Sequence, residues 1–268
     1  MNNGPVVRID ASGGVGHITL NRPERRNALH HDMFPPIKAA LSDWSDDDSI
    51  GCIVLTGEGK GFCSGGDVRD GRRRRSGEAR PTVEDATSVL GDDAEVARML
   101  YESPKIVLAA VNGAAVGAGM SLALACDLRI MAASATFIPG WGRLAFSGDF
   151  GGTWFLTRML GASKALEVLA GDVQISADEA LALGLVNRVV PDDNFADAWK
   201  DWAAELARGP STAHTLMKAN VRDAVALSLE SFLPRETERQ VRSSRTEDHK
   251  KAVQVWLEAM PGRDVHDQ

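Results

Sequence analysis

The sequence predicts an α/β protein whose C-terminal region is helical, and three observations predict this class. Brief apolar segments bounded by Gly, Pro or Asp alternate with segments of helical periodicity through the first part of the chain. Beyond Ser163 the helical patterns dominate. The chain of 268 residues is 44% hydrophobic, which is sufficient to bury a substantial core.

The predicted strands are short apolar segments with turn residues at their ends. They span residues 15–20, 52–55, 106–110 and 128–131. Helical periodicity is found in residues 32–44, 94–102, 117–125 and 151–160. The segment 70–93 contains consecutive arginines at 72–75 and many Ser, Gly and acidic residues, so we expect a long mobile loop there.

The C-terminal part is expected to be helical except for one strand at residues 185–190, which ends at Pro191. Ser176 is a candidate N-cap with Glu179 three residues later, and Gly184 is a candidate stop for the same helix. The predicted helices span residues 163–170, 176–183, 195–206, 212–227, 229–242 and 247–259. We therefore expect a core domain over residues 1–195 and a helical region over residues 196–268.

Charge and cysteine content exclude several classes of protein. The net charge of −7 argues against a general nucleic-acid-binding protein, which needs a basic face. Cys52, Cys63 and Cys126 lack the CxxC spacing of a zinc site, so we expect reduced, partly buried thiols. The first ten residues have no apolar leader pattern, and no uncharged apolar stretch reaches the roughly 20 residues that span a bilayer. These observations favour a cytoplasmic protein.

Six short motifs occur along the chain. They are residues 18–29 (ITLNRPERRNAL), 61–68 (GFCSGGDV), 111–128 (VNGAAVGAGMSLALACDL), 151–161 (GGTWFLTRMLG), 177–191 (ADEALALGLVNRVVP) and 247–250 (EDHK). Together and in this order they resemble the enoyl-CoA hydratase/isomerase family, also called the crotonase superfamily. The resemblance covers residues 15–258 and is specific because six motifs agree in sequence order.

This resemblance implies a crotonase (ClpP-like) fold, a spiral of ββα turns followed by a C-terminal helical trimerisation region. It implies a homotrimer or homohexamer. It also implies an acyl-CoA thioester as substrate, no metal or redox cofactor, and coenzyme A only as part of the substrate. The pattern of strands and helices alone predicts no more than an α/β protein with a helical tail.

The resemblance implies an oxyanion hole made by the backbone N–H groups of Gly66 and Ala118. A thioester enolate carries negative charge on its carbonyl oxygen, and preorganised donors stabilise that charge by roughly 3–4 kcal/mol each. Ala118 also precedes an apolar helix, whose first N–H groups and positive dipole end favour an anion. Ordinary turn and packing residues are the structural alternative.

Family hydratases use two glutamates to activate and deliver water, and neither is present here. The matching positions hold Ser121 and Trp141, which cannot act as carboxylate bases. Asp149, eight residues after Trp141, matches the position of an acid/base aspartate in some family isomerases. One carboxylate with a pKa raised by apolar walls can move a proton between two carbons. The structural alternative is that Asp149 caps the helix that follows.

The sequence therefore favours a double-bond isomerase that uses Asp149 as its acid/base. One alternative is an enoyl-CoA hydratase with a rearranged acid/base set, such as Glu95 with Asp149. Another is a catalytically inactive acyl-CoA-binding protein. The pair of Trp141 and Asp149 also resembles the 4-chlorobenzoyl-CoA dehalogenase branch, but the histidine which that branch places near residues 92–96 is absent.

Further substrate contacts are implied by the same motifs. Arginine side chains suit the phosphates of coenzyme A because they donate paired hydrogen bonds. The implied contacts are Arg25, Arg26, Ser64, Asp67, Val68, Arg69, Ser121, Trp141 and Trp256. Trp256 matches an aromatic residue that reaches a neighbouring subunit's ligand, although Ala259 stands where the family often has lysine. The arginines at 72–75 are either a further phosphate clamp or a solvated charge run.

Overall fold

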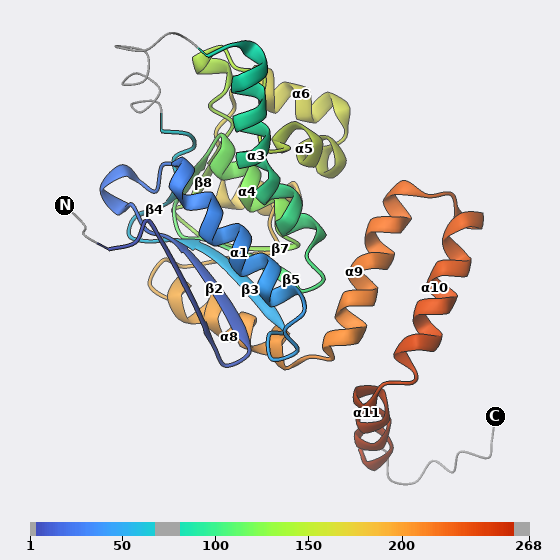
Figure 1. Ribbon diagram of the computed structural model, residues 1–268. Helices are drawn as coiled ribbons and strands as arrows, with labels where there is room; N and C mark the ends of the chain where they lie inside the picture. Colours follow the sequence, from blue (N-terminus) through green and yellow to red (C-terminus); the bar gives the residue numbers. More distant parts are fainter. Residues whose placement is uncertain (1–3, 68–80, 260–268) are drawn as a thin grey trace. The chain divides into compact units, whose positions relative to one another are not determined.

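The computed structural model describes residues 4–67 and 81–259, and it contains two β-sheets surrounded by helices (Figure 1). The larger sheet has the strand order β1-β2-β3-β5-β7-β10, in which only the β1–β2 pair is antiparallel. The smaller sheet has the order β4-β6-β8-β9, with an antiparallel β8–β9 pair. Parallel pairing requires crossover connections, and helices provide most of them.

The strands are short, and the longest contain six residues. The larger sheet contains β1 (Val7–Ser12), β2 (Val15–Leu20), β3 (Cys52–Gly57), β5 (Ile106–Val111), β7 (Leu128–Ala132) and β10 (Arg188–Val190). The smaller sheet contains β4 (Gly61–Cys63), β6 (Ala114–Val116), β8 (Thr136–Ile138) and β9 (Ile175–Ser176).

The helices of the core are α1 (Phe34–Ser45), α3 (Val83–Glu102), α4 (Ala118–Ala125), α5 (Gly152–Leu160), α6 (Ala162–Ala170), α7 (Ala177–Ala182) and α8 (Phe195–Arg208). Short 3-10 helices span Pro23–Arg25 (η1), His31–Met33 (η2) and Gly142–Leu144 (η3). The C-terminal helices are α9 (Ser211–Ala226), α10 (Leu229–Ser243) and α11 (Glu247–Glu258).

Successive turns of the chain build a spiral. Each of β3–β4, β5–β6 and β7–β8 places one strand in the larger sheet and the next in the smaller one. The helices α3 and α4 close the first two of these turns, so the predicted spiral of ββα units is observed. Every residue of α4 is buried, which explains why its sequence is apolar on all faces.

All five predicted strands are confirmed and lie in the larger sheet; β2 has the predicted bounds, and the strand predicted at residues 185–190 is shorter, since β10 begins at Arg188. The prediction of a loop up to residue 93 is wrong, because α3 already begins at Val83. Thr82 caps this helix by accepting a hydrogen bond of 3.1 Å from the Asp85 N–H. The first half of α3 is fully exposed, and its Ser, Gly and acidic residues are typical of a loop. The arginines at 72–75 lie outside the described residues.

The chain divides into two compact units between Ala207 and Arg208, so nearly all of α8 belongs to the first unit. In the second unit α9 and α10 pack as a helical hairpin, in which Arg239 of α10 forms an ion pair of 2.8 Å with Asp223 of α9. The three cysteines are free thiols, as predicted, but they are fully rather than partly buried. No helix within the described part of the chain is both long and apolar enough to cross a bilayer.

Candidate active site

The first predicted oxyanion residue lies just after β4, where a parallel bridge joins Gly66 to Leu29. The bridge uses the Leu29 N–H, which donates to Gly65 O at 2.8 Å, and the Asp67 N–H, which donates to Leu29 O at 3.1 Å. The Gly66 N–H takes part in neither bond and has no acceptor among the described residues. It is therefore available to an external oxygen.

The second predicted oxyanion residue, Ala118, is the first residue of α4. Gly117 precedes it with φ 54° and ψ −124°, a conformation that favours glycine because a Cβ atom is strained there. No side chain caps this end of the helix, and the Ala118 N–H has no acceptor among residues 4–67 and 81–259. The N–H also lies at the positive end of the helix dipole.

The two oxyanion segments lie against each other. Gly65 has φ +84°, and a Cβ atom added there would lie 2.9 Å from Val116 O and 3.8 Å from the Ala118 nitrogen. Only glycine permits this approach, so the sequence of the second motif brings the Gly66 turn to the start of α4. The structure thus brings the two segments that carry the predicted donors next to each other.

Trp141 and Asp149 form a direct side-chain pair. The Trp141 Nε1–H donates a hydrogen bond of 2.9 Å to Asp149 Oδ1. Trp141 is buried, and its Nε1 lies 3.7 Å from the position a Cβ atom would take at Gly117. The pair therefore lies beside the residue that precedes the Ala118 donor.

Asp149 does not cap α5 with its side chain. The N-cap of α5 is Gly151, and no side-chain capping bond is present. The backbone carbonyl of Asp149 instead accepts the Gly152 N–H at 3.0 Å. The capping interpretation of Asp149 is therefore wrong, and its carboxylate is left with only Trp141 as a partner in the described part of the chain.

The environment of Asp149 changes its acidity. Burial raises the pKa of the Asp149 carboxyl above its ordinary value, while the hydrogen bond from Trp141 lowers that pKa and partly opposes the increase. Burial also raises the pKa of the adjacent Cys63 thiol to about 12, and the negative charge of Asp149 adds to that increase. Asp149 is thus half-buried close to β4, and Cys63 stays protonated at neutral pH.

Ser121 lies behind Asp149 and is fully buried. Its hydroxyl donates to the Asp149 carbonyl oxygen at 3.0 Å and lies 3.4 Å from Gly117 O. A Cβ atom at Gly152 would overlap Ser121 Oγ and lie 2.6 Å from Trp141 Cη2. Ser121 and Trp141, which occupy the positions where hydratases carry glutamates, therefore both lie next to Gly152. Contact of Ser121 with substrate stays a prediction, since the observed bonds hold the backbone of Asp149.

A pocket of about 520 Å³ opens beside Gly66. Its lining residues are Glu24, Arg25, Arg26, Ala28, Ser64, Gly66 and Asp67. Arg25 and Arg26 are exposed at its rim, and Ser64 donates a hydrogen bond of 3.2 Å to Arg25 O. The pocket thus joins two predicted coenzyme A contacts to one predicted oxyanion donor.

Arg22, for which the sequence predicts no role, contacts a residue that lines the Gly66 pocket. Its guanidinium forms an ion pair of 2.9 Å with Asp67 and donates to Ala28 O at 2.6 Å. This pair links the first motif to the second, and it engages the Asp67 carboxylate that was expected to contact substrate. Arg22 belongs to the first motif and Asp67 to the second. Because 45 residues separate them, no local sequence pattern predicts their contact.

The remaining predicted residues lie elsewhere. Val68 and Arg69 lie outside the described residues. Trp256 is exposed on α11 in the second compact unit, so its reach to a neighbouring ligand stays a prediction. Glu95 on α3 accepts two hydrogen bonds of 2.9 Å from Arg98 Nε, and these bonds lower the pKa of Glu95. Glu95 is therefore poorly suited to act as a general base.

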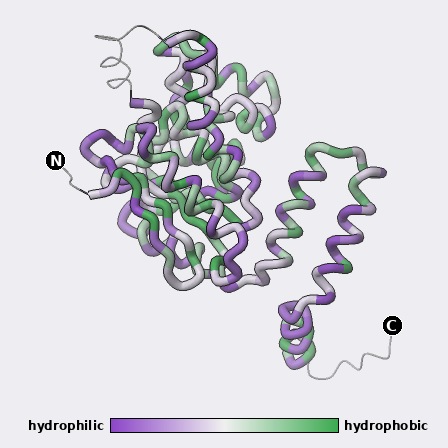
Figure 2. The backbone as a smooth tube through the Cα atoms, viewed as in Figure 1, coloured by the Kyte–Doolittle hydropathy of each residue, from purple (hydrophilic) through white to green (hydrophobic). Residues whose placement is uncertain are grey.

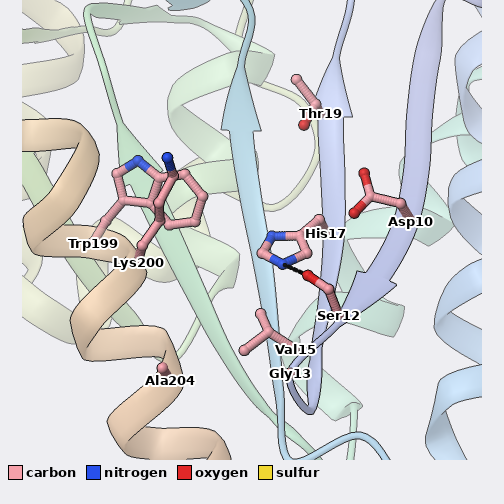
Figure 3. Close-up of a pocket in the computed structure, with 9 residues that line it drawn as sticks. All are labelled: Asp10, Ser12, Gly13, Val15, His17, Thr19, Trp199, Lys200 and Ala204. Atoms are coloured by element: carbon pink, nitrogen blue, oxygen red, sulfur yellow. Dashed lines mark hydrogen bonds between the residues drawn. The ribbon is translucent and has the colours of Figure 1, made fainter.

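A second pocket of about 410 Å³ lies between the β1–β2 hairpin and α8. Figure 3 shows His17 of β2 facing Trp199 and Lys200 of α8. The Ser12 hydroxyl is hydrogen-bonded to Nε2 of the His17 ring. Burial lowers the pKa of His17, and Asp10 opposes that decrease. The pocket contains none of the predicted site residues, so the candidate active site is the Gly66 pocket with its neighbouring Trp141–Asp149 pair.

Comparison of sequences places the chain among known enzymes. The enoyl-CoA hydratase/isomerase family profile matches residues 10–263. A probable enoyl-CoA hydratase of Rhodobacter capsulatus is 38% identical over 95% of this chain and 96% of its own length. The 1,2-epoxyphenylacetyl-CoA isomerase of Escherichia coli is 36% identical over 91% of this chain and 92% of its own. A 4-chlorobenzoyl coenzyme A dehalogenase of Arthrobacter is 32% identical over 88% of this chain and 85% of its own.

Solved structures agree with this placement. An enoyl-CoA hydratase from Polaromonas superposes with a TM-score of 0.88 and 30% identity, covering 96% of this chain and 98% of that one. An enoyl-CoA hydratase subunit from Geobacillus kaustophilus gives a TM-score of 0.86 and 32% identity, with 97% of each chain covered. The fold is therefore the crotonase fold, and the protein is a member of the enoyl-CoA hydratase/isomerase family.

Proposed function

We propose that the protein isomerises the carbon–carbon double bond of an enoyl-CoA thioester, with Asp149 as the single acid/base. The observation that carries this proposal is the arrangement of the Asp149 carboxylate. Oδ1 is held by the Trp141 indole, while Oδ2 has no partner among the described residues. A fixed carboxylate with one open oxygen suits a group that must take up and return a proton.

The reaction begins with a 3-enoyl-CoA bound through its thioester carbonyl. Asp149 Oδ2 removes a proton from C2, and the electron pair delocalises as a dienolate whose negative charge lies on the carbonyl oxygen. The N–H groups of Gly66 and Ala118 donate to that oxygen. Asp149 then returns the proton to C4, which gives the 2-enoyl-CoA. The proton moves within one substrate and no net oxidation occurs, so the route requires no redox cofactor.

Two features of the site lower the barriers of these steps. The increased pKa of Asp149 brings the carboxylate closer to the basicity that general-base catalysis at neutral pH requires. Each preorganised donor contributes on the order of a 100- to 1,000-fold rate increase when its removal is the measure. Both donors are backbone groups, so neither needs to reorganise as charge develops.

The alternative of a hydratase with Glu95 and Asp149 as its acid/base pair has less support. Glu95 is bound by Arg98, and its pKa is lowered rather than raised. The glutamate positions of hydratases are occupied by Ser121 and Trp141, which face one another beside Gly152. A site with one proton carrier can isomerise a double bond, whereas hydration needs a group that activates water.

A second acyl class also merits a test. The Escherichia coli and Arthrobacter relatives are named for 1,2-epoxyphenylacetyl-CoA and 4-chlorobenzoyl-CoA, whose acyl groups carry a six-membered carbon ring. This chain shares with the dehalogenase-like pattern the pair of Trp141 and Asp149, observed as a hydrogen bond. We therefore include 3-enoyl esters that carry a phenyl group among the candidate substrates of the proposed isomerase.

Coenzyme A is proposed to bind through Arg25 and Arg26 at the rim of the Gly66 pocket. We also propose assembly into a trimer or hexamer through the C-terminal helices. The basis is an apolar stripe on α9, defined here as Met217, Val221 and Val225, which are 59%, 67% and 61% exposed. Figure 2 shows further hydrophobic residues around the turn that joins α9 to α10. An exposed patch of this kind is typical of an interface.

The experiment that tests the proposed function is a turnover screen with short, medium and phenyl-bearing 3-enoyl-CoA and 2-enoyl-CoA esters. Isomerisation of a 3-enoyl ester, without gain of water mass from the 2-enoyl ester, is the expected result. Water addition as the main reaction would favour the rearranged hydratase. Tight binding without turnover of any ester would favour the non-catalytic acyl-CoA-binding protein.

A further inference from the structure

Asp172 holds the loop that carries Trp141. It lies between α6 and β9, far from Trp141 in sequence, and its side chain is only 14% exposed. Its Oδ1 accepts the Gly140 N–H at 2.7 Å. Its Oδ2 forms an ion pair with the Arg143 guanidinium. The two oxygens therefore bind residues on both sides of Trp141, namely Gly140 and Arg143.

Two further features support this attachment of Asp172 to the Trp141 loop. Asp172 adopts φ 48°, in the left-handed region where Asp and Asn are better tolerated than most side chains. A Cβ atom at Gly142 would lie 3.8 Å from the Asp172 Cβ and 3.7 Å from Leu169 O. The Trp141 loop thus lies against the end of α6, and the Asp172 carboxylate is its principal polar attachment.

The loop in turn fixes the indole. The carbonyl oxygen of Trp141 accepts the N–H groups of Leu144 and Phe146 at 3.0 and 2.9 Å, so residues 141–146 form one compact turn. The indole Nε1–H of Trp141 then reaches Asp149. A displacement of the turn moves this N–H, and hydrogen bonds weaken steeply when distance and angle depart from their optimum.

We propose that Asp172 is a positioning residue, which aligns the Trp141 indole and through it the Asp149 carboxylate. The inference rests on the proposed function for its effect on turnover, but its structural part is independent of any activity. Asp172 does not line the Gly66 pocket and does not contact Asp149 in the described structure. Its effect is therefore expected on kcat rather than on the binding of coenzyme A.

Three variants separate the role of the acceptor from the role of the backbone conformation. Asp172→Gly tolerates φ 48° but removes both carboxylate oxygens. Asp172→Asn tolerates the same φ and retains an acceptor for the Gly140 N–H. Arg143→Ala removes only the partner of Oδ2. The indole N–H resonance of Trp141, assigned with Trp141→Phe, reports the hydrogen bond to Asp149 without requiring substrate.

We expect Asp172→Gly to shift the Trp141 indole resonance towards that of a water-exposed indole and to accelerate its hydrogen exchange. Its kcat should fall on the order of tenfold to 100-fold, with acyl-CoA affinity unchanged. In Asp172→Asn the indole resonance and kcat should both remain close to those of the unmodified protein. Arg143→Ala should shift the resonance and lower kcat less than Asp172→Gly does. An unshifted resonance in Asp172→Gly overturns the inference. If Asp172→Gly does not fold, an unshifted resonance in Arg143→Ala overturns it.

The same measurements distinguish this inference from the proposed function. A shifted indole resonance in a protein that isomerises no ester would support the positioning role and contradict the isomerase proposal. If the protein is an active isomerase and Asp172→Gly changes neither its turnover nor its indole resonance, only the positioning role is contradicted.

Discussion

The Trp141 indole and the Asp149 carboxylate form a hydrogen bond of 2.9 Å at a site where family hydratases carry glutamate in place of the tryptophan. The bond has two consequences. It orients one oxygen of Asp149, and it opposes the increase of the Asp149 pKa that burial causes. Trp141 therefore adjusts both the geometry and the acidity of the proposed acid/base.

The first prediction concerns the pH dependence of turnover in Trp141→Phe. A base must be ionised, so kcat/KM should fall as pH decreases through the pKa of Asp149. Loss of the indole bond removes the interaction that lowers this pKa, so the acidic limb should move to higher pH. Trp154→Phe is the matched control, because Trp154 contacts Tyr101 and Phe155 rather than Asp149. Equal profiles for both variants would contradict the prediction.

The increased pKa of Asp149 also predicts an effect on stability. For a group whose pKa is higher in the folded state, the stabilisation is present below the unfolded pKa and is lost as pH rises through the folded value. Asp149→Asn should therefore leave the thermal midpoint at pH 7 unchanged or higher, and should flatten its decline above the unfolded value of about 3.9. A lower midpoint at pH 7 in calorimetry would argue that the carboxylate has a structural role.

The oxyanion proposal predicts the behaviour of Ala118→Pro. Ala118 is the first residue of α4, the helical position where proline is best tolerated because the N–H has no helical partner. The substitution removes the donor, and kcat should fall about 100- to 1,000-fold. Ala118→Ser keeps the N–H and is the control. A folded Ala118→Pro protein with near-normal turnover would remove Ala118 from the mechanism.

Arg25 is predicted to bind the phosphates of coenzyme A. Arg25→Ala should weaken the binding of an acyl-CoA in isothermal titration and reduce the dependence of affinity on salt, because screening acts on fewer charges. Arg158→Ala is the control, since Arg158 stacks on Trp154 and does not line the Gly66 pocket. Identical losses for the two variants would mean that Arg25 contributes only general charge.

The apolar stripe of α9 is predicted to lie in a subunit interface. Light scattering at micromolar concentration should give the mass of a trimer or hexamer. Val221→Asp places a charge in the stripe and should shift the mass towards the monomer. Thr212→Asp, on an exposed part of α9 outside the stripe, should not. A monomeric unmodified protein would contradict the prediction directly.

The sequence allowed prediction of those parts of the fold in which local pattern and burial agree. Strands β3 and β5 of the larger sheet are apolar because they are almost fully buried, and α4 is apolar because every residue of it is buried. The three-residue strands β4, β6 and β8 are too short to show a period. The first half of α3 is exposed, and its Ser, Gly and acidic residues predict a loop because no buried face constrains its composition.

The candidate site divides in the same way. Gly66, Ala118 and Asp149 could be named as candidates because motifs mark them. The pair of Trp141 and Asp149 was also marked, by its spacing of eight residues. The ion pair of Arg22 with Asp67 and the bond of Asp172 to Gly140 instead join residues that are 45 and 32 positions apart. No local pattern encodes such contacts, since they arise only when the sheets stack the segments.

The role of Asp149 as the acid/base is tested most directly by the rate of a single turnover of a 3-enoyl-CoA in Asp149→Asn. The affinity of this variant for the same ester is measured together with the rate. Asparagine keeps the size of the side chain and accepts the Trp141 hydrogen bond, but it cannot carry a proton. We expect nearly unchanged affinity and a rate at least about 100-fold lower. A full rate in the folded variant would contradict Asp149 as the acid/base.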